Sequence, residues 1–160
     1  MEVGPGLCDF IKIAKYCGSK KQYIIDKNPL FLMLGQAIGA NDYIQFDFIK
    51  DDLDEVSFPK YDILFIKGFL NVDLYDKKSV ERIVTLLTKN INPNGTGIWS
   101  TYNTYRDNMK KNEYKQRLSH LTHIFNNLGW KIIELSEKES EAAGFNYPEY
   151  VDLISFKIDK

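Results

Sequence analysis

The sequence predicts an α/β fold in which a mostly parallel sheet is covered by helices on both faces. Two observations predict it. Short apolar runs typical of strands alternate with segments of helical periodicity over most of the chain. One run, Asp62–Ile66, is almost continuously apolar, which is typical of a strand buried on both faces. Alternating strands and helices favour a parallel sheet with helical crossovers.

The first part of the chain starts with a strand, a turn and a helix. Residues 1–3 form a short strand, and a turn that contains glycine follows it. Leu7–Cys17 carries apolar residues at helical spacing, and Gly18 stands where a left-handed cap would end that helix. Gln22–Ile25 is a short apolar run that ends at Asp26, and we expect the second strand there.

The middle of the chain continues the alternation. Pro29 opens an apolar helix that extends to about Ile38, since proline is favoured in the first turn of a helix. We expect the third strand at Tyr43–Phe46 and the central fourth strand at Asp62–Ile66.

The last part of the chain is expected to add two helices and three strands. Val80–Ile91 has helical periodicity, and the turn residues Asn92–Gly95 should end that helix. The final two apolar runs have no helical pattern between them, so we expect them to be antiparallel. The remaining expected elements are a strand at Gly97–Thr101, a helix at Leu118–Leu128 capped by Gly129, and strands at Trp130–Leu135 and Tyr150–Ile158.

Composition limits the class of protein. With 160 residues we expect a single domain over 1–160. The 21 Lys and Arg residues balance 22 Asp and Glu, so we expect no nucleic-acid partner. Cys8 and Cys17 lack the spacing of a zinc site or a disulfide framework, which predicts no metal and a cytoplasmic location. Pro29–Ala40 is too short to cross a membrane, and nothing indicates the oligomeric state.

The turn after the first strand, Glu2–Cys8, carries the clearest sign of a ligand site. Gly4 and Gly6 allow a ligand to approach the backbone closely. Asp26 stands twenty residues after Gly6 at the end of the second strand, where a carboxylate can accept hydrogen bonds from ribose hydroxyls. Because ligands of parallel sheets bind beyond the carboxyl ends of the strands, the two features together predict a nucleoside site.

These residues resemble the motifs of class I, Rossmann-like S-adenosylmethionine-dependent methyltransferases. The segment Glu2–Gly6 resembles the acidic-x-Gly-x-Gly first motif, and Ile25–Pro29 resembles the second. Asp47 and Phe48 are similar to the segment that borders adenine, and Tyr61–Phe65 to the fourth strand. The resemblance implies a seven-stranded sheet with an antiparallel last strand, and S-adenosylmethionine as the cofactor.

The resemblance also implies roles for individual residues. Gly4 and Gly6 would adjoin the methionine part of the cofactor, Asp26 would bind the ribose, and Asp47 with Phe48 would adjoin adenine. Glu2 would shape the turn and add negative potential near the sulfonium. The full set expected to bind the cofactor is Glu2, Gly4, Pro5, Gly6, Asp26, Lys27, Asp47, Phe48 and Lys67.

Two features depart from the family pattern. Cys8 replaces the third glycine of the first motif. The first strand is short and lacks the helix that covers the cofactor in the family, so we expect either that an upstream segment is missing or that the site is unusually open.

The sequence indicates the residues that would bind the methyl acceptor less clearly than those that would bind the cofactor. We expect the substrate to be bound by residues that follow the fourth and fifth strands, namely Phe69, Tyr102, Asn103 and Tyr105. No Asn-Pro-Pro-Tyr-like segment follows the fourth strand, which favours a small-molecule acceptor over an amino group of a planar base. No catalytic residue is assigned, since in-line methyl transfer can depend on positioning alone. Two alternatives stay open: a non-catalytic interaction or regulatory domain of the same fold, and a Rossmann-like enzyme that uses a nicotinamide cofactor.

Overall fold

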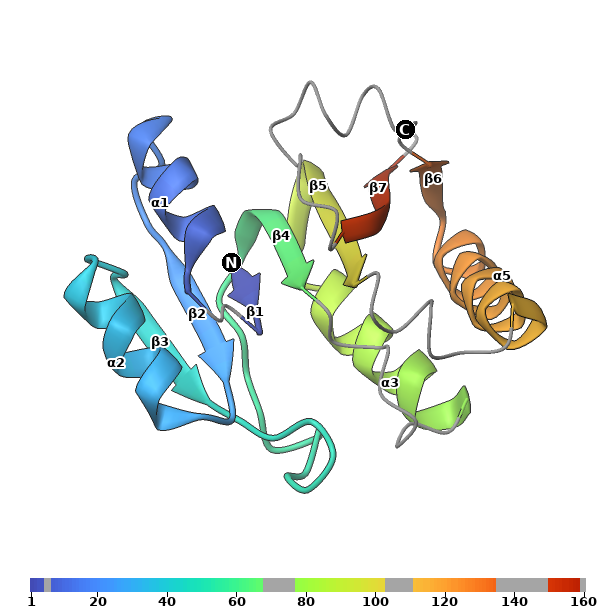
Figure 1. The fold of residues 1–160 in the computed structure, drawn as a ribbon, viewed down its shortest axis with the longest axis horizontal. Helices are drawn as coiled ribbons and strands as arrows, with labels where there is room; N and C mark the ends of the chain where they lie inside the picture. The colour runs from blue at the N-terminus through green and yellow to red at the C-terminus, as the bar shows by residue number, and fades with distance from the viewer. Residues whose placement is uncertain (5–6, 68–76, 103–110, 135–149, 159–160) are drawn as a thin grey trace.

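The computed structural model describes residues 1–4, 7–67, 77–102, 111–134 and 150–158. Strands and helices alternate from the first strand to the last helix, as the sequence predicts, except that the fourth strand follows the third without an intervening helix (Figure 1). The elements are β1 (Glu2–Val3), α1 (Asp9–Tyr16), β2 (Tyr23–Asp26), α2 (Pro29–Ala37), β3 (Asp42–Gln45), β4 (Tyr61–Lys67), α3 (Lys77–Thr88), β5 (Ile91–Tyr102), α5 (Lys111–Asn127), β6 (Trp130–Glu134) and β7 (Tyr150–Ile158).

All the strands belong to one sheet, in the order β3-β2-β1-β4-β5-β7-β6. The pairs from β3 to β5 are parallel, whereas β7 is antiparallel to both β5 and β6. The predicted α/β class with a mostly parallel sheet is therefore confirmed, and the apolar Asp62–Ile66 run lies in the central strand.

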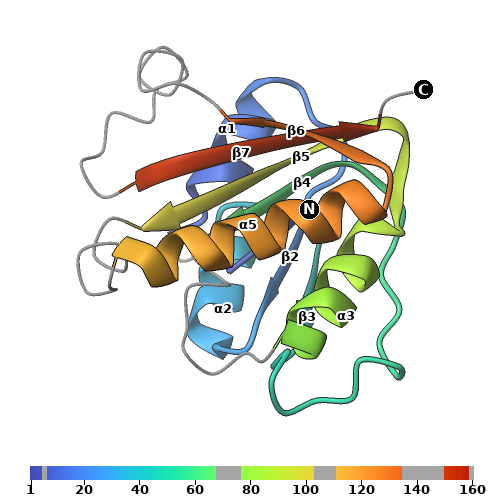
Figure 2. The ribbon, with the colours of Figure 1, turned by 90° about the vertical axis from the view of Figure 1, so that its right-hand side faces the viewer.

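Helices cover both faces of the sheet. Helices α1 and α2 lie on one face and α3 and α5 on the other (Figures 1 and 2). Side chains of β4 alternate between these layers. Leu64 and Ile66 are fully buried in the large core that includes Phe125 of α5, whereas the Phe65 ring stacks on Phe10 of α1 with centroids 4.5 Å apart. The apolar sequence of β4 thus reflects its contacts on both faces.

The connection between β3 and β4 contains turns and no helix. It is held to the sheet by an aromatic cluster. The Phe46 ring packs edge-on against the rings of Phe48 and Phe58, with centroid distances of 5.0 Å and 6.4 Å. All three rings are buried. Burying an aromatic side chain of this size stabilises the fold by about 1.5–3 kcal/mol, so the cluster can hold this segment in place of a helix.

Several expected boundaries are wrong, and the last helix begins at Lys111 instead of Leu118. Leu7 precedes α1 and is exposed, because the turn before it continues as far as Cys8. Ile91 starts β5 instead of ending a helix, and Asn92–Gly95 lies inside that strand. The predicted turn is a bulge: Tyr61 pairs with Ile91, but Ile63 pairs with Thr96.

Both glycines expected to cap helices do so, since Gly18 and Gly129 have φ values of +85° and +78°. Within the described residues, no helix has the length and apolar character needed to span a bilayer.

Candidate functional site

The carboxyl ends of β1 and β2 bring the first motif and the second strand together. Val3 pairs with Ile25 in parallel register, and the Gly4 amide donates a hydrogen bond to the Ile25 carbonyl at 3.0 Å. Gly4 therefore lies beside Asp26, which follows Ile25. Gly4 has a φ of +66°, in the left-handed region that glycine enters without strain, so the chain can leave the sheet sharply at this point. The structure thus joins these two predicted residues at one edge.

The Glu2 carboxylate lies beneath this turn. Its side chain is fully buried, and Oε2 accepts a hydrogen bond from the Ile11 amide at 3.1 Å. Cys8, the N-cap residue of α1, makes no side-chain capping bond. Glu2 therefore caps α1 from the neighbouring strand, where its negative charge also interacts favourably with the helix dipole.

Asp26 is half-buried at the end of β2. Its Oδ1 accepts a hydrogen bond from the Asn28 amide at 2.8 Å, which orients the carboxylate at the strand end. Burial raises the pKa of Asp26, while the Asn28 amide and the Lys27 charge oppose that increase. A half-buried, oriented carboxylate is suited to accept hydrogen bonds from a diol.

The amino end of α1 has a negative electrostatic environment. Burial raises the pKa of the Cys8 thiol to about 11, with Glu2, Asp9 and Asp26 adding to the increase and Lys12 opposing it. Three carboxylates thus act on one position at the start of the helix. Because Glu2 also takes one amide of the first turn, this helix end favours a cationic group over the phosphate that helix amino termini commonly bind.

The end of β3 lies next to Asp26, because the Phe46 amide donates to the Asp26 carbonyl at 3.1 Å. Asp47 follows, half-buried, and its Oδ1 accepts from the Ile49 amide at 3.0 Å. Phe48 is only 6% exposed and packs in the aromatic cluster. The structure therefore brings Asp47 to the candidate site, while the Phe48 ring faces the core and its contact with adenine stays a prediction.

The other predicted site residues are less well defined. Lys27 is exposed beside Asp26, and its carbonyl accepts from Gln45 Nε2 at 3.4 Å. Lys67 ends β4 and Tyr102 ends β5, so both reach the same edge of the sheet as Asp26. Pro5, Gly6, Phe69, Asn103 and Tyr105 lie outside the described residues. Among the described residues, no three His, Cys, Asp or Glu side chains are grouped to hold a metal ion.

Sequence reasoning missed two residues that build this edge. Asn28 caps α2, with its Oδ1 accepting from the Leu30 amide at 3.0 Å. The Asn28-Pro29 pair is a recognisable helix start, so this role could have been found. Cys8 is fully buried against α2, a contact that no local sequence pattern indicates.

A groove of about 600 Å³ lies elsewhere, between the β3–β4 connection and α3. None of its lining residues was predicted to bind a ligand. They are Leu53, Asp54, Lys78, Glu81, Arg82, Thr85, Leu86 and Lys89.

No protein-family model matches this sequence, and no curated protein matches it either. Solved structures match over nearly the whole chain. A plantazolicin methyltransferase, solved with a triazolic desmethyl analog and SAH, is 13% identical with a TM-score of 0.66, over 99% of this chain and 76% of its own.

Two further structures give the same result. The N-methyltransferase NodS from Bradyrhizobium japonicum, solved with S-adenosyl-L-homocysteine, is 13% identical with a TM-score of 0.62, over 99% of this chain and 76% of its own. An O-methyltransferase family protein from Burkholderia thailandensis is 10% identical with a TM-score of 0.67, over 99% of this chain and 50% of its own. This chain has the fold of class I S-adenosylmethionine-dependent methyltransferases.

Proposed function

We propose that this chain binds S-adenosylmethionine at the carboxyl ends of β1, β2 and β3 and transfers its methyl group to a small-molecule acceptor. The observation that carries the proposal is the position of Gly4 beside Asp26, at the point where β1 and β2 end. This arrangement occurs in a chain with the fold of S-adenosylmethionine-dependent methyltransferases.

The charges at this edge fit the proposed cofactor. S-adenosylmethionine carries a sulfonium, an ammonium and a ribose diol, and it has no phosphate. The half-buried Asp26 carboxylate suits the diol, and the negative environment at the start of α1 suits the cationic groups. The same environment disfavours the pyrophosphate of a nicotinamide dinucleotide, which requires free helix amides.

Each predicted residue has a place in this proposal. Gly4, Pro5 and Gly6 would adjoin the methionine part, with Glu2 supporting them from below. Asp26 and Lys27 would flank the ribose, Asp47 and Phe48 would adjoin adenine, and Lys67 would lie at the end of the central strand. Phe69, Tyr102, Asn103 and Tyr105 would bind the acceptor above β4 and β5.

The bound cofactor would supply an activated methyl group for in-line displacement. The protein would contribute by holding the acceptor and the cofactor in line, a positioning effect that can account for much of the rate without a dedicated base. A small acceptor is supported by the plantazolicin methyltransferase, whose structure holds a desmethyl analog. Neither Cys8 nor Cys17 forms a disulfide, which is consistent with a cytoplasmic setting.

Titration calorimetry with S-adenosylhomocysteine tests the proposal. We expect one site per folded chain and no measurable heat with the nicotinamide dinucleotide at the same concentration. The exposed Asp42 offers a matched control for substitutions of Asp26, because it lies at the opposite, amino end of β3, where Asp42→Asn removes a carboxylate away from the proposed site. Tighter binding of the dinucleotide, or a folded chain that binds neither ligand, would contradict it. Binding without consumption of S-adenosylmethionine across a panel of small acceptors would favour a non-catalytic domain.

A further inference from the structure

Cys8 adopts a backbone conformation that a residue with a side chain rarely takes. Its φ and ψ are 57° and 39°, in the left-handed region, at the N-cap of α1. Glycine enters this region without strain, whereas a Cβ atom there approaches the following carbonyl oxygen too closely. A cysteine at this position therefore needs a compensating contact elsewhere in the protein.

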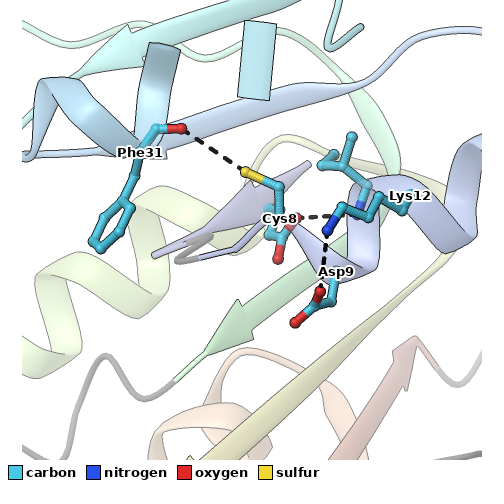
Figure 3. A network of polar contacts seen from close by, with 6 residues as sticks. Cys8, Asp9, Lys12 and Phe31 are labelled. Carbon is cyan, nitrogen blue, oxygen red and sulfur yellow. Dashed lines mark hydrogen bonds and ion pairs between the residues drawn. The ribbon is translucent and has the colours of Figure 1, made fainter. Parts of the chain in front are cut away.

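The compensating contact is with α2. The Cys8 side chain is fully buried, and its thiol donates to the Phe31 carbonyl with Sγ and O 3.8 Å apart (Figure 3). Gly35 lies four residues after Phe31, on the same face of the helix. A Cβ placed on Gly35 would lie 3.6 Å from Cys8 Sγ and would clash with the Ile24 side chain. The lack of a side chain at Gly35 thus accommodates Ile24, while an added Cβ would meet the thiol only in ordinary van der Waals contact.

Helix α2 is in turn fixed to the ribose side of the proposed site. The Asn28 amide donates to Asp26 Oδ1 at 2.8 Å, and Asn28 Oδ1 accepts from the Leu30 amide at 3.0 Å. The glycine turn between β1 and α1 begins at Gly4, whose amide donates a hydrogen bond to the Ile25 carbonyl. The turn between Gly4 and Cys8 is therefore attached at both ends to the segment that carries Asp26.

We propose that Cys8 is a positioning residue: its buried thiol fastens the start of α1 to α2 and so fixes the glycine turn relative to Asp26. The inference rests on the proposed function, in which the turn and Asp26 hold two parts of one cofactor. Through this contact, a displacement of α2 moves the turn with it.

The ionisation state of Cys8 agrees with this role. Burial, with a contribution from Glu2, raises the pKa of the thiol to about 11, so Cys8 is a protonated donor at neutral pH. A protonated, buried thiol is a poor nucleophile, which separates this role from covalent catalysis.

The first test uses hydrogen exchange of the unliganded chain, followed residue by residue by NMR. Cys8→Ala should accelerate exchange of the Gly4 and Asn28 amides about tenfold or more relative to the Leu64 amide in the central strand. Cys8→Gly should do the same although it relieves the backbone strain, and Cys8→Ser should restore part of the protection because its hydroxyl can still donate. The control is Leu32→Val, which removes one methylene from the same apolar cluster.

The second test measures the affinity for S-adenosylhomocysteine. Cys8→Ala should weaken binding about tenfold or more, because small misplacements of a binding group are costly. Leu32→Val should leave the affinity within about threefold, as expected of a substitution outside the site. Equal effects of Cys8→Ala and Leu32→Val in both tests would overturn the proposal, as would full affinity in Cys8→Gly.

The two tests also separate the proposals. If the wild-type chain does not bind S-adenosylhomocysteine, the proposed function fails, and the exchange rates still decide whether Cys8 fixes the turn. If the wild type binds but the Gly4 and Asn28 amides do not respond to Cys8→Ala, the positioning role fails and the proposed function stands.

Discussion

Asp26 illustrates how a binding residue can cost stability. Its folded-state pKa is raised above the unfolded value, mainly by burial. The folded chain therefore binds this proton more tightly, so the contribution of Asp26 to stability is greatest below the unfolded pKa and is lost as pH rises through the folded pKa. The ionised carboxylate is incompletely solvated, a state that a cofactor diol would relieve by hydrogen bonding.

We expect Asp26→Asn to weaken S-adenosylhomocysteine binding while leaving the free chain as stable as the wild type or more stable. Asparagine keeps an acceptor for the Asn28 amide but removes the charge. Hydrogen bonds to a charged group contribute about 1.5–3 kcal/mol, so calorimetry should show a loss of affinity of about tenfold to a hundredfold.

Urea denaturation at several pH values supplies the stability measurement for the same variant. The advantage of Asp26→Asn should be largest above the folded pKa of Asp26 and should shrink as pH falls through it. An advantage that grows in acid would mean that the carboxylate stabilises the free chain.

Glu2, in contrast to Asp26, stabilises the free chain, because its buried carboxylate caps α1. Glu2→Ala leaves the Ile11 amide without this acceptor, and a buried unsatisfied group costs about 1–3 kcal/mol. Chemical denaturation should show that loss, and Glu2→Gln, which retains an oxygen acceptor, should lose less. Equal losses in the two variants would show that the capping bond is not the source of the stability.

Some of the contacts between individual residues could be predicted from the sequence, and others could not. The spacing of Gly4 and Asp26 was sufficient to place them together, since each ends a parallel strand and adjacent parallel strands end at one edge. The bond from Ile11 to Glu2 and the contact of Cys8 with α2 depend on how α1 packs, and no local pattern encodes them.

Among the elements, most helices and strands could be predicted because apolar periodicity and capping residues agree. The Asn92–Gly95 segment fails because its composition is that of a turn, whereas tertiary pairing with β4 includes it in β5 as a bulge. Asn94 has a φ of +67°, and Asn92 Nδ2 donates to Asp62 Oδ1 at 2.9 Å. The segment therefore has the positive φ and the side-chain hydrogen bond expected of turn residues, although β5 continues through it.

This bulge predicts opposite effects at two neighbouring positions. A Cβ on Gly95 would lie 2.8 Å from the Asp62 carbonyl oxygen and 2.9 Å from that of Asn92, both of which are backbone atoms. Gly95→Ala should therefore destabilise the chain by about 1–3 kcal/mol, the usual cost of overpacking. Asn94→Gly should be neutral or stabilising by less than about 1 kcal/mol, because glycine accepts the left-handed conformation freely.

Thermal unfolding of both variants measures these effects. A Gly95→Ala variant as stable as the wild type would mean that the Asp62 backbone moves easily, and that the bulge does not fix the register of β5 against β4.

For the whole molecule, the described residues of the candidate site lie mainly on β1, β2 and β3, at one side of the sheet. The large apolar core nevertheless extends across the sheet, since it includes Val3 and Ile25 together with Phe125 and Trp130. A continuous core favours cooperative unfolding, so stabilisation at the cofactor edge should reach the far side.

The two tryptophans allow that coupling to be measured, because Trp99 and Trp130 lie on β5 and β6, outside the β1–β3 side of the sheet. A ligand at a hundred times its Kd adds about 2.7 kcal/mol to stability, which raises Tm by about 5–10 °C in a chain of this size. Saturating S-adenosylhomocysteine should therefore shift tryptophan fluorescence and far-ultraviolet circular dichroism transitions by the same amount. Asp26→Asn should show little of the shift. If circular dichroism shifts while tryptophan fluorescence does not, the two sides of the sheet unfold separately, and cofactor binding stabilises only the β1–β3 side.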